Sequence, residues 1–218
     1  MDIFSKYKIE HNSLSEMAYN KIKSLIIDNS LKPGEKIIQE KMAADLGISK
    51  IPLIQALTVL HNEGLLEKIP RKGFYVKKFL NAEIADIFDI RSALEMLCVS
   101  KVIEKMNPEI EKTLKSFMDD FKIYYQKKNS KKYYETDVKF HQFLIDAADN
   151  EILKSIIDNF NILLICYTKG FVLELNESYS QHNSVIESLL EKDTEKAEAA
   201  IRQHILRINE KFKLINNN

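Results

Sequence analysis

Four residues in the second half of the chain could together bind a metal ion. Asp137 and His141 are four residues apart, so a helix would place both side chains on one face. His182 and His204 stand among apolar residues at helical spacing, which predicts that they also face a helix-bundle interior. One carboxylate and three imidazoles suit Zn²⁺ or another divalent first-row metal. Zinc is the leading expectation, and the ligand set alone does not separate it from nickel, manganese or iron.

Each of these histidines also has a structural interpretation, because a buried imidazole is commonly satisfied by hydrogen bonds within the core. On that interpretation the bundle binds no metal. Arg91 has two interpretations as well, since it lies in an apolar stripe that runs from Ile84 to Cys98. A charge buried there needs a partner. Either Glu95, one helical turn further on, pairs with it, or Arg91 binds the carboxylate of a ligand.

The elements that must position these residues are helices. From Asn81 onward, apolar residues recur at helical spacing and residues that break helices are few. The pattern predicts six helices, near residues 81–105, 108–128, 131–148, 151–173, 177–190 and 193–214. They would form an all-α bundle, which we take as a second domain over residues 79–218.

Residues 42–60 have the pattern of a helix-turn-helix. A short helix ends at Gly47, a residue type that tolerates the left-handed conformation common at helix ends. Ser49 suits the N-cap of a second helix, where its hydroxyl is expected to accept a backbone N–H. Pro52 suits the first turn, because its missing N–H would have no helical partner there. Two helices joined by about three residues around a glycine are the layout of a DNA-reading motif.

The second helix of this motif has a buried face and an exposed face. Leucines recur at helical spacing on the buried face, at Leu53, Leu57 and Leu60. The opposite face would present four side chains to the outside: Lys50, Ile51, Ile54 and Gln55. Two short strands near residues 65–69 and 74–77 then flank Pro70–Gly73, which predicts a hairpin with a basic tip, the wing of a winged helix.

An amphipathic helix that begins at Ser13 completes an N-terminal domain of residues 1–78. This domain holds 13 Lys and Arg residues against 9 Asp and Glu residues, a net charge of +4, although the whole chain is neutral. The remainder therefore carries a net charge of −4. A basic first third suits a polyanionic partner such as DNA, and an acidic remainder does not.

Composition restricts the class of protein. An apolar share of 45% in 218 residues is ordinary for a soluble globular chain. No apolar run approaches the roughly 20 residues that cross a bilayer, so no membrane partner is expected. The charged start, Met1–Asn12, does not resemble a signal peptide. Cys98 and Cys166 lack metal-ligand spacing and are expected to be buried free thiols in a reducing cytoplasm.

Taken together, four segments resemble the winged helix of GntR-type bacterial transcription regulators: Leu31–Ile37, Leu46–Leu57, Glu63–Leu65 and Lys72–Val76. The second domain resembles the FCD ligand-binding domain of the FadR subfamily, in its shorter, VanR-like six-helix form. The resemblance implies a mainly α protein, with an N-terminal winged helix-turn-helix and a C-terminal FCD-like bundle. It also implies a homodimer that binds a palindromic double-stranded DNA operator and responds to a small carboxylic acid.

The chain departs from this family in its recognition helix. The family pattern reads Ser-Arg-x-Pro-Val-Arg-Glu-Ala-Leu, whereas the two arginine positions here hold Lys50 and Ile54, and the glutamate position holds Gln55. Isoleucine offers only apolar contact, for example to a thymine methyl group. DNA contact is therefore carried over to the following residues: Ser49, Lys50, Ile51, Pro52, Gln55, Lys72 and Gly73. The role of an arginine is not carried over to Ile54.

The resemblance also implies the metal ligands, because many FCD domains hold a metal with Asp-x3-His and two later histidines. The matching residues are Asp137, His141, His182 and His204, and the family arginine matches Arg91, which would bind the effector. The expected function is a metabolite-responsive transcription regulator, a repressor rather than an enzyme. A metalloenzyme and a regulator with a metal-free bundle are the alternatives. Effector, target genes and metal identity are not encoded in any motif.

Overall fold

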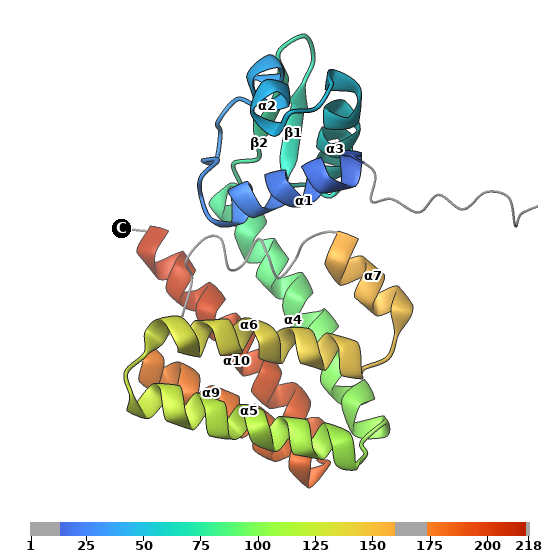
Figure 1. The fold of residues 1–218 in the computed structure, drawn as a ribbon. Helices are drawn as coiled ribbons and strands as arrows, with labels where there is room; N and C mark the ends of the chain where they lie inside the picture. The colour runs from blue at the N-terminus through green and yellow to red at the C-terminus, as the bar shows by residue number, and fades with distance from the viewer. Residues whose placement is uncertain (1–13, 160–173, 217–218) are drawn as a thin grey trace, which may run out of the picture. The chain divides into compact units, whose positions relative to one another are not determined.

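The computed structural model describes residues 14–159 and 174–216 (Figure 1). The chain divides into two compact units, Met1–Lys78 and Phe79–Asn218, which are described separately below. Cys166 and His11 lie outside the described residues, as does the part of the expected helix 151–173 beyond residue 159.

The N-terminal unit is a winged helix. Its elements are α1 (Leu14–Ile27), α2 (Gln39–Leu46), α3 (Lys50–Asn62), β1 (Leu66–Ile69) and β2 (Gly73–Val76). Helix α1 packs against α3, whose leucine stripe is fully buried as the sequence predicted. The strands pair antiparallel with Leu66 opposite Val76 and Ile69 opposite Gly73, so the predicted hairpin is confirmed.

The turn between α2 and α3 differs from the expectation in one detail. Gly47 is left-handed with φ of 66°, and its N–H bonds the carbonyls of Ala43 and Ala44, which ends α2 as predicted. Ser49 is the N-cap of α3, but its side chain makes no capping hydrogen bond. The expected hydroxyl cap is therefore wrong, because an extended backbone at Ser49 suffices to begin the helix without it.

The C-terminal unit is helical throughout its described part. Its helices are α4 (Asn81–Glu104), α5 (Pro108–Gln126), α6 (Ser130–Ala147), α7 (Glu151–Asn159), α9 (Leu175–Glu191) and α10 (Thr194–Asn216). Asparagine side chains cap the starts of α5 and α6. Asn107 accepts the N–H groups of Glu109 and Ile110, and Asn129 accepts that of Lys132.

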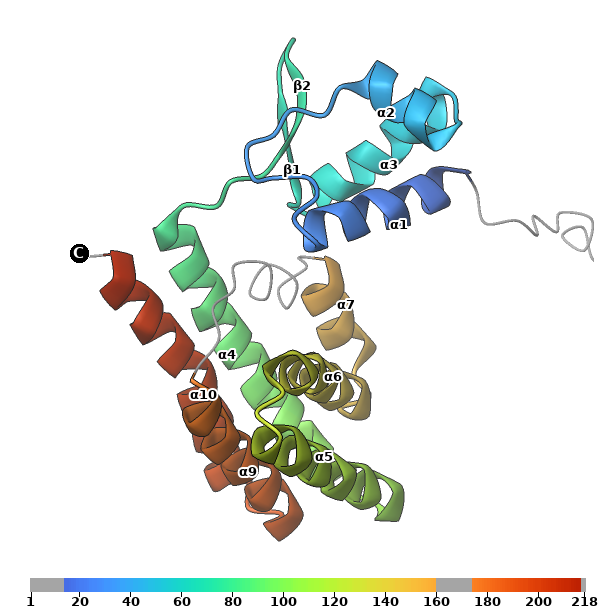
Figure 2. The same cartoon turned by 60° about the vertical axis from the view of Figure 1, so that its left-hand side comes forward.

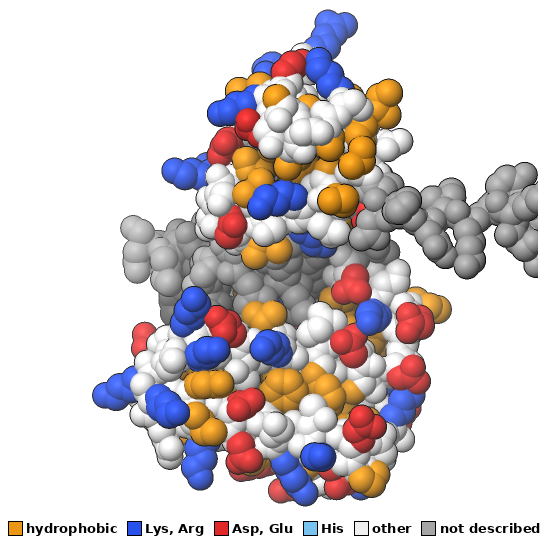
Figure 3. Space-filling view, viewed as in Figure 1, with side chains coloured by type: hydrophobic (Ala, Val, Ile, Leu, Met, Phe, Trp, Pro, Cys, Tyr) orange, Lys and Arg blue, Asp and Glu red, His pale blue; other side chains and the backbone are white. Residues whose placement is uncertain are grey.

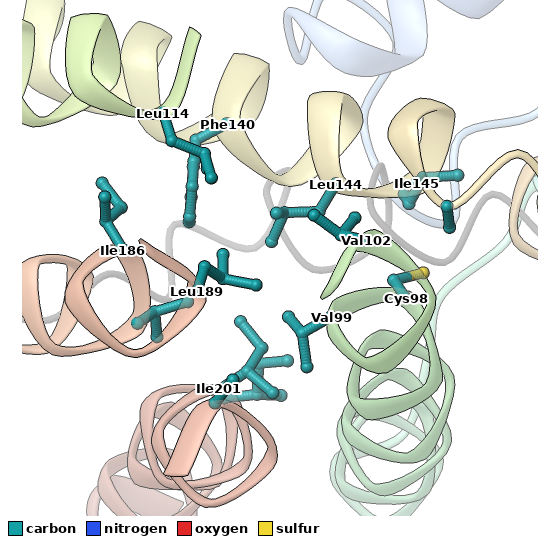
Figure 4. Packing of buried hydrophobic residues seen from close by; sticks show 14 of the residues in the cluster. Cys98, Val99, Val102, Leu114, Phe140, Leu144, Ile145, Ile186, Leu189 and Ile201 are labelled. Carbon is teal, nitrogen blue, oxygen red and sulfur yellow. The ribbon is translucent and has the colours of Figure 1, made fainter. Parts of the chain in front are cut away.

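The core of this unit lies between its helices, and α7 contributes Leu153 and Ile157 to it. Figure 4 shows side chains of α4, α5, α6, α9 and α10 pointing toward one another. Helix α5 contacts both α6 and α9, while α4 contacts α6 and packs most extensively against α10, an arrangement that Figure 2 shows from the side. Polar Asn209 of α10 also bonds the carbonyl of Ala85 in α4, at 3.2 Å.

The apolar stripe of α4 belongs to the core. Ile84, Phe88, Cys98 and Val99 pack inside the unit, so a dimer contact through this helix would have to use another side of it. Burial raises the pKa of the Cys98 thiol, in agreement with an inert buried thiol. The exposed apolar residues of α4 are instead Ile90 and Leu97, on another side of the helix.

Among the described residues, no single helix has both the length and the apolar run needed to cross a bilayer. Helices α2 and α3 meet that test only when they are taken together, and they are bent by 111° at the break between them.

Candidate metal centre and nucleic-acid interface

Three helices bring the four predicted metal ligands together. Asp137 and His141 come from α6, His182 from α9 and His204 from α10. All four residues are buried, and one ligand atom from each lies within 4.8 Å of the others. The expectation that these side chains face the bundle interior is correct. Ligands about 2.0–2.2 Å from one ion lie within this separation of one another.

The closest approaches in the cluster join the atoms that could bind a metal. Nε2 of His182 lies 2.6 Å from Oδ1 of Asp137, and Nε2 of His141 lies 3.3 Å from Nε2 of His204. Oδ1 of Asp137 and Nε2 of His182 are nevertheless buried without a hydrogen bond. The short distance is therefore proximity without bonding geometry, as for two atoms that point at a common third position.

The other ring nitrogen of each histidine has an acceptor. Nδ1 of His141 bonds the carboxylate of Glu95. Nδ1 of His182 lies 2.9 Å from the carbonyl oxygen of Ser178, which can only accept, and 3.0 Å from the hydroxyl of Tyr133. Nδ1 of His204 lies 3.0 Å from Oε1 of Gln181. A histidine that donates from Nδ1 presents a lone pair at Nε2. These partners thus aim three Nε2 lone pairs and one carboxylate at one place, an arrangement that suits a cation.

The protonation of two members of the cluster agrees with this assignment, whereas His141 must lose a proton to bind a metal. Burial acts to lower the pKa of His141, but the charge of Glu95 outweighs it and raises that pKa. Burial, together with the charges of His182 and His141, holds the pKa of His204 well below its usual value, so its imidazole is neutral at neutral pH. Burial alone would raise the pKa of Asp137, but His182 and His141 outweigh it and hold that pKa well below the usual range. A neutral imidazole and an ionised carboxylate are the forms that bind metals.

Arg91 lies beside this cluster and is paired. Its Nε is 2.6 Å from Oε1 of Glu95, and both side chains are buried. Burial acts to raise the pKa of Glu95, but the charges of Arg91 and His141 hold it below its usual value. The internal Arg91–Glu95 pair is thus present, and Glu95 links the arginine to His141.

Several residues around the cluster have roles that the sequence did not reveal. Glu95 was considered only as a partner of Arg91, and its bond to His141 depends on the packing of α4 against α6. Gln181 and Ser178 are ordinary polar residues in sequence, so nothing marked them as partners of histidines. Phe121 stacks on the ring of His182 at 4.3 Å between centroids, which fixes the ring plane. In the sequence, only the helical spacing of Phe121 could have suggested that it points inward.

The expected reading face of α3 is exposed. Lys50, Ile51, Ile54 and Gln55 are all accessible, and the Lys50 amine lies 2.8 Å from Oε1 of Glu40 in α2. Pro52 is only half-exposed in the first turn. At the wing, Lys72 is exposed and Gly73 is half-buried with φ of 97°. Figure 3 shows Lys and Arg side chains projecting at the end of this unit where the hairpin tip lies.

Comparison with known families agrees with both units. The model of bacterial regulatory proteins of the gntR family matches residues 14–76, and that of the FCD domain matches residues 86–207. The chain therefore belongs to the GntR family of transcription regulators that carry an FCD domain. The family and its relatives regulate transcription and are not enzymes, so the metalloenzyme alternative is set aside.

Individual relatives match over nearly the whole chain. The HTH-type transcriptional regulator YdhC of Bacillus subtilis is 27% identical over 192 residues, 86% of this chain and 84% of its own. The HTH-type transcriptional repressor GlaR of Escherichia coli is 26% identical over 200 residues, 86% and 90% of the two chains. The solved structure of E. coli McbR/YncC has the same fold, with a TM-score of 0.71, 22% identity and coverage of 91% and 98%.

Proposed function

We propose that this chain is a metal-dependent transcriptional repressor that a small carboxylic acid controls. The observation that carries the proposal is the convergence of three Nε2 lone pairs and one carboxylate inside the bundle, each imidazole oriented through Nδ1. A bundle that is only structural would be expected to pair Asp137 Oδ1 and His182 Nε2 with donors. Residues 79–218 would sense the acid and form the dimer, and residues 1–78 would bind DNA.

In this proposal Asp137, His141, His182 and His204 hold a divalent ion. Zinc is the first candidate, with nickel, manganese and iron as alternatives that the same ligands accept. The metal, when bound, supplies a Lewis-acidic point that attracts a carboxylate. The chain itself supplies the orientation of the rings, through Glu95, Ser178 and Gln181, and the dry surroundings that strengthen the attraction.

Arg91 is the proposed effector contact. It is buried, and its partner Glu95 links it to the cluster. A guanidinium has five N–H donors in a geometry that suits carboxylates. An arriving acid would compete with Glu95 for the arginine. Because Glu95 also orients His141, that competition would reach the metal ligands and the packing of α4 against α6.

The DNA contacts are proposed for the exposed start of α3 and for the wing, through these residues: Ser49, Lys50, Ile51, Pro52, Gln55, Lys72 and Gly73. A dimer would present two such heads to a palindromic operator in the cytoplasm. Affinity would then depend on the spacing of the heads, since half-sites lie about 34 Å apart or at another fixed separation. A coupling of about 1–3 kcal/mol between acid and operator, a 5- to 150-fold change, is the usual size.

The DNA-binding part is tested with the untagged, full-length protein and the promoter region of its own gene. Fluorescence anisotropy at low salt, with unrelated DNA as competitor, should show specific binding. Absence of binding to that region at low salt would overturn the proposal that this chain is a DNA-binding repressor. The same measurement in the presence of candidate acids then tests whether an acid changes the affinity for the operator.

The sensing part is tested by metal analysis and by thermal unfolding against a panel of small mono- and dicarboxylic acids. Protein purified without a His-tag should carry a divalent metal near one ion per chain. An acid that binds should stabilise the protein by about 2.7 kcal/mol at a hundredfold excess over its dissociation constant. That stabilisation should disappear in protein stripped by a chelator. If the acid stabilises the stripped protein equally, acid binding does not depend on the metal.

A further inference from the structure

Two large apolar side chains lie exposed at the start of α3. Ile51 is 72% exposed and Ile54 is 40% exposed, while the leucines of the same helix are fully buried. Single exposed apolar residues are ordinary on protein surfaces. These two, however, are three residues apart and therefore neighbours on one face of the helix. In Figure 3, hydrophobic side chains are exposed on the side of this unit where Figure 1 places α3.

The polar residue beside them is an amide. Gln55 follows Ile51 by four residues and Ile54 by one, so all three side chains belong to the exposed face of the first two turns. Neighbouring Cβ atoms at this spacing lie about 5–6 Å apart, which spans one to two base-pair steps. Lys50 is the sole cation of Lys50–Thr58, and its amine faces Glu40.

Each of these side chains has a defined complement in the major groove. An isoleucine offers no hydrogen bond, but it can bury the methyl group of thymine. A glutamine can bond N6 and N7 of adenine together. Guanine is read most often by arginine or lysine, and this part of the face offers only Lys50.

On the proposed binding of DNA through α3, we infer that Ile51 and Ile54 contact thymine methyl groups and that Gln55 reads an adenine. Each operator half-site would then contain a core of A·T pairs beneath the start of α3. Sequence preference would come from these contacts, whereas Lys50 and the basic wing would bind the phosphates without discriminating between sequences.

The test begins with selection of bound duplexes from a random library by the full-length protein. In the selected operator, each thymine is then replaced by uracil, which removes only the methyl group. Two positions in each half-site should lose about fourfold in affinity, as expected for one buried methyl group of about 0.8 kcal/mol. Replacing the neighbouring adenine by 7-deazaadenine should weaken binding as well, because it removes the N7 acceptor.

Protein variants assign each contact. The Ile51→Ala protein should no longer distinguish thymine from uracil at the position that Ile51 contacts, but should still do so at the position of Ile54. The Ile54→Ala protein should show the reverse. Gln55→Ala should lose the response to 7-deazaadenine. Val59→Ala, an exposed apolar residue later in the same helix, is the matched control and should keep every discrimination. All four sites are exposed, so circular dichroism and melting temperature should match the parent protein.

The outcomes separate this inference from the proposed function. If no duplex binds at low salt, the proposed DNA binding fails. If duplexes bind but no sequence is enriched, or the enriched core is G·C, the inference is overturned and DNA binding stands. An A·T core that is indifferent to uracil also overturns it, because preference would then come from the shape of the minor groove rather than from methyl contacts.

Discussion

Glu95 of α4 accepts a hydrogen bond from Nδ1 of His141 in α6 and also pairs with Arg91 through its other oxygen. One carboxylate thus holds a candidate metal ligand and a candidate effector contact. Partners of this kind fix the orientation of a histidine ligand and raise its basicity. Glu95 is therefore expected to act as a positioning residue for the metal.

Glu95→Gln should weaken metal binding by about 10- to 100-fold, the usual cost of losing such a partner. The amide still accepts a hydrogen bond but lacks the charge that balances Arg91. Breaking a buried ion pair costs about 3–5 kcal/mol, so unfolding of the metal-free variant in urea should show a loss of this order. Competition with a fluorescent chelator measures the metal affinity.

Glu104→Gln is the matched control for Glu95→Gln, because it removes an equal charge from the exposed end of the same helix, where Glu104 pairs with Lys101. It should leave metal affinity unchanged and stability within about 1 kcal/mol. A folded Glu95→Gln protein with the metal affinity of the parent would contradict the positioning role.

Removing a ligand should remove the metal without removing the DNA-binding head. His182→Ala and His204→Ala should each lower metal content strongly, while binding to the operator stays measurable. Gln203→Ala, next to His204 but exposed, should retain the metal and serves as the control. Metal analysis after dialysis gives the content. If both histidine variants keep a full complement of metal, the ligand assignment is wrong.

Much of the fold could be predicted from local patterns. The leucine stripe of α3, Gly47 at the end of α2 and the hairpin around Pro70–Gly73 are all set by residues close in sequence. The inward direction of His141 and His182 also followed from helical spacing. These features depend on periodicity and turn chemistry, which a single sequence contains.

The remaining features depend on which helices become neighbours. That Gln181 would meet His204 requires the packing of α9 against α10, and the link from Glu95 to His141 requires α4 beside α6. Helical spacing gives each residue a face but no partner. For the same reason, helical spacing marked the stripe of α4 as apolar without showing that it packs inside the unit.

The dimer surface is therefore expected on the other side of α4. Ile90 and Leu97 are 52% and 43% exposed, and their spacing of seven residues places them on one face. Sedimentation should give twice the 25.4 kDa of the chain. The double variant Ile90→Asp with Leu97→Asp should sediment as a monomer. It should bind the operator about 10²-fold or more weakly, because a dimer gains this much when both of its heads bind the same operator.

Ile123→Asp is the control for this pair of changes, because Ile123 is a comparably exposed apolar residue on α5. It should leave the mass and the operator affinity unchanged. A double variant on α4 that still sediments as a dimer would place the interface elsewhere.

Glu40 should limit the affinity of this protein for DNA. Its carboxylate lies 2.8 Å from the Lys50 amine at the start of the reading helix, and both side chains are exposed. A phosphate that binds Lys50 must displace Glu40, and the remaining carboxylate repels the backbone of the duplex. Glu40→Gln should therefore tighten DNA binding several-fold, with little change in stability, because exposed pairs contribute only about 0–1 kcal/mol.

The dependence of DNA affinity on salt identifies the cause of this gain. If Lys50 gains a phosphate contact, the plot of log affinity against log salt should steepen by about 0.9. Asp45→Asn removes an equal charge from the exposed far end of α2 and should give a smaller gain without the steeper slope. Equal effects from the two variants would mean that only the net charge of the DNA-binding unit matters, and that Glu40 does not keep Lys50 from binding a phosphate.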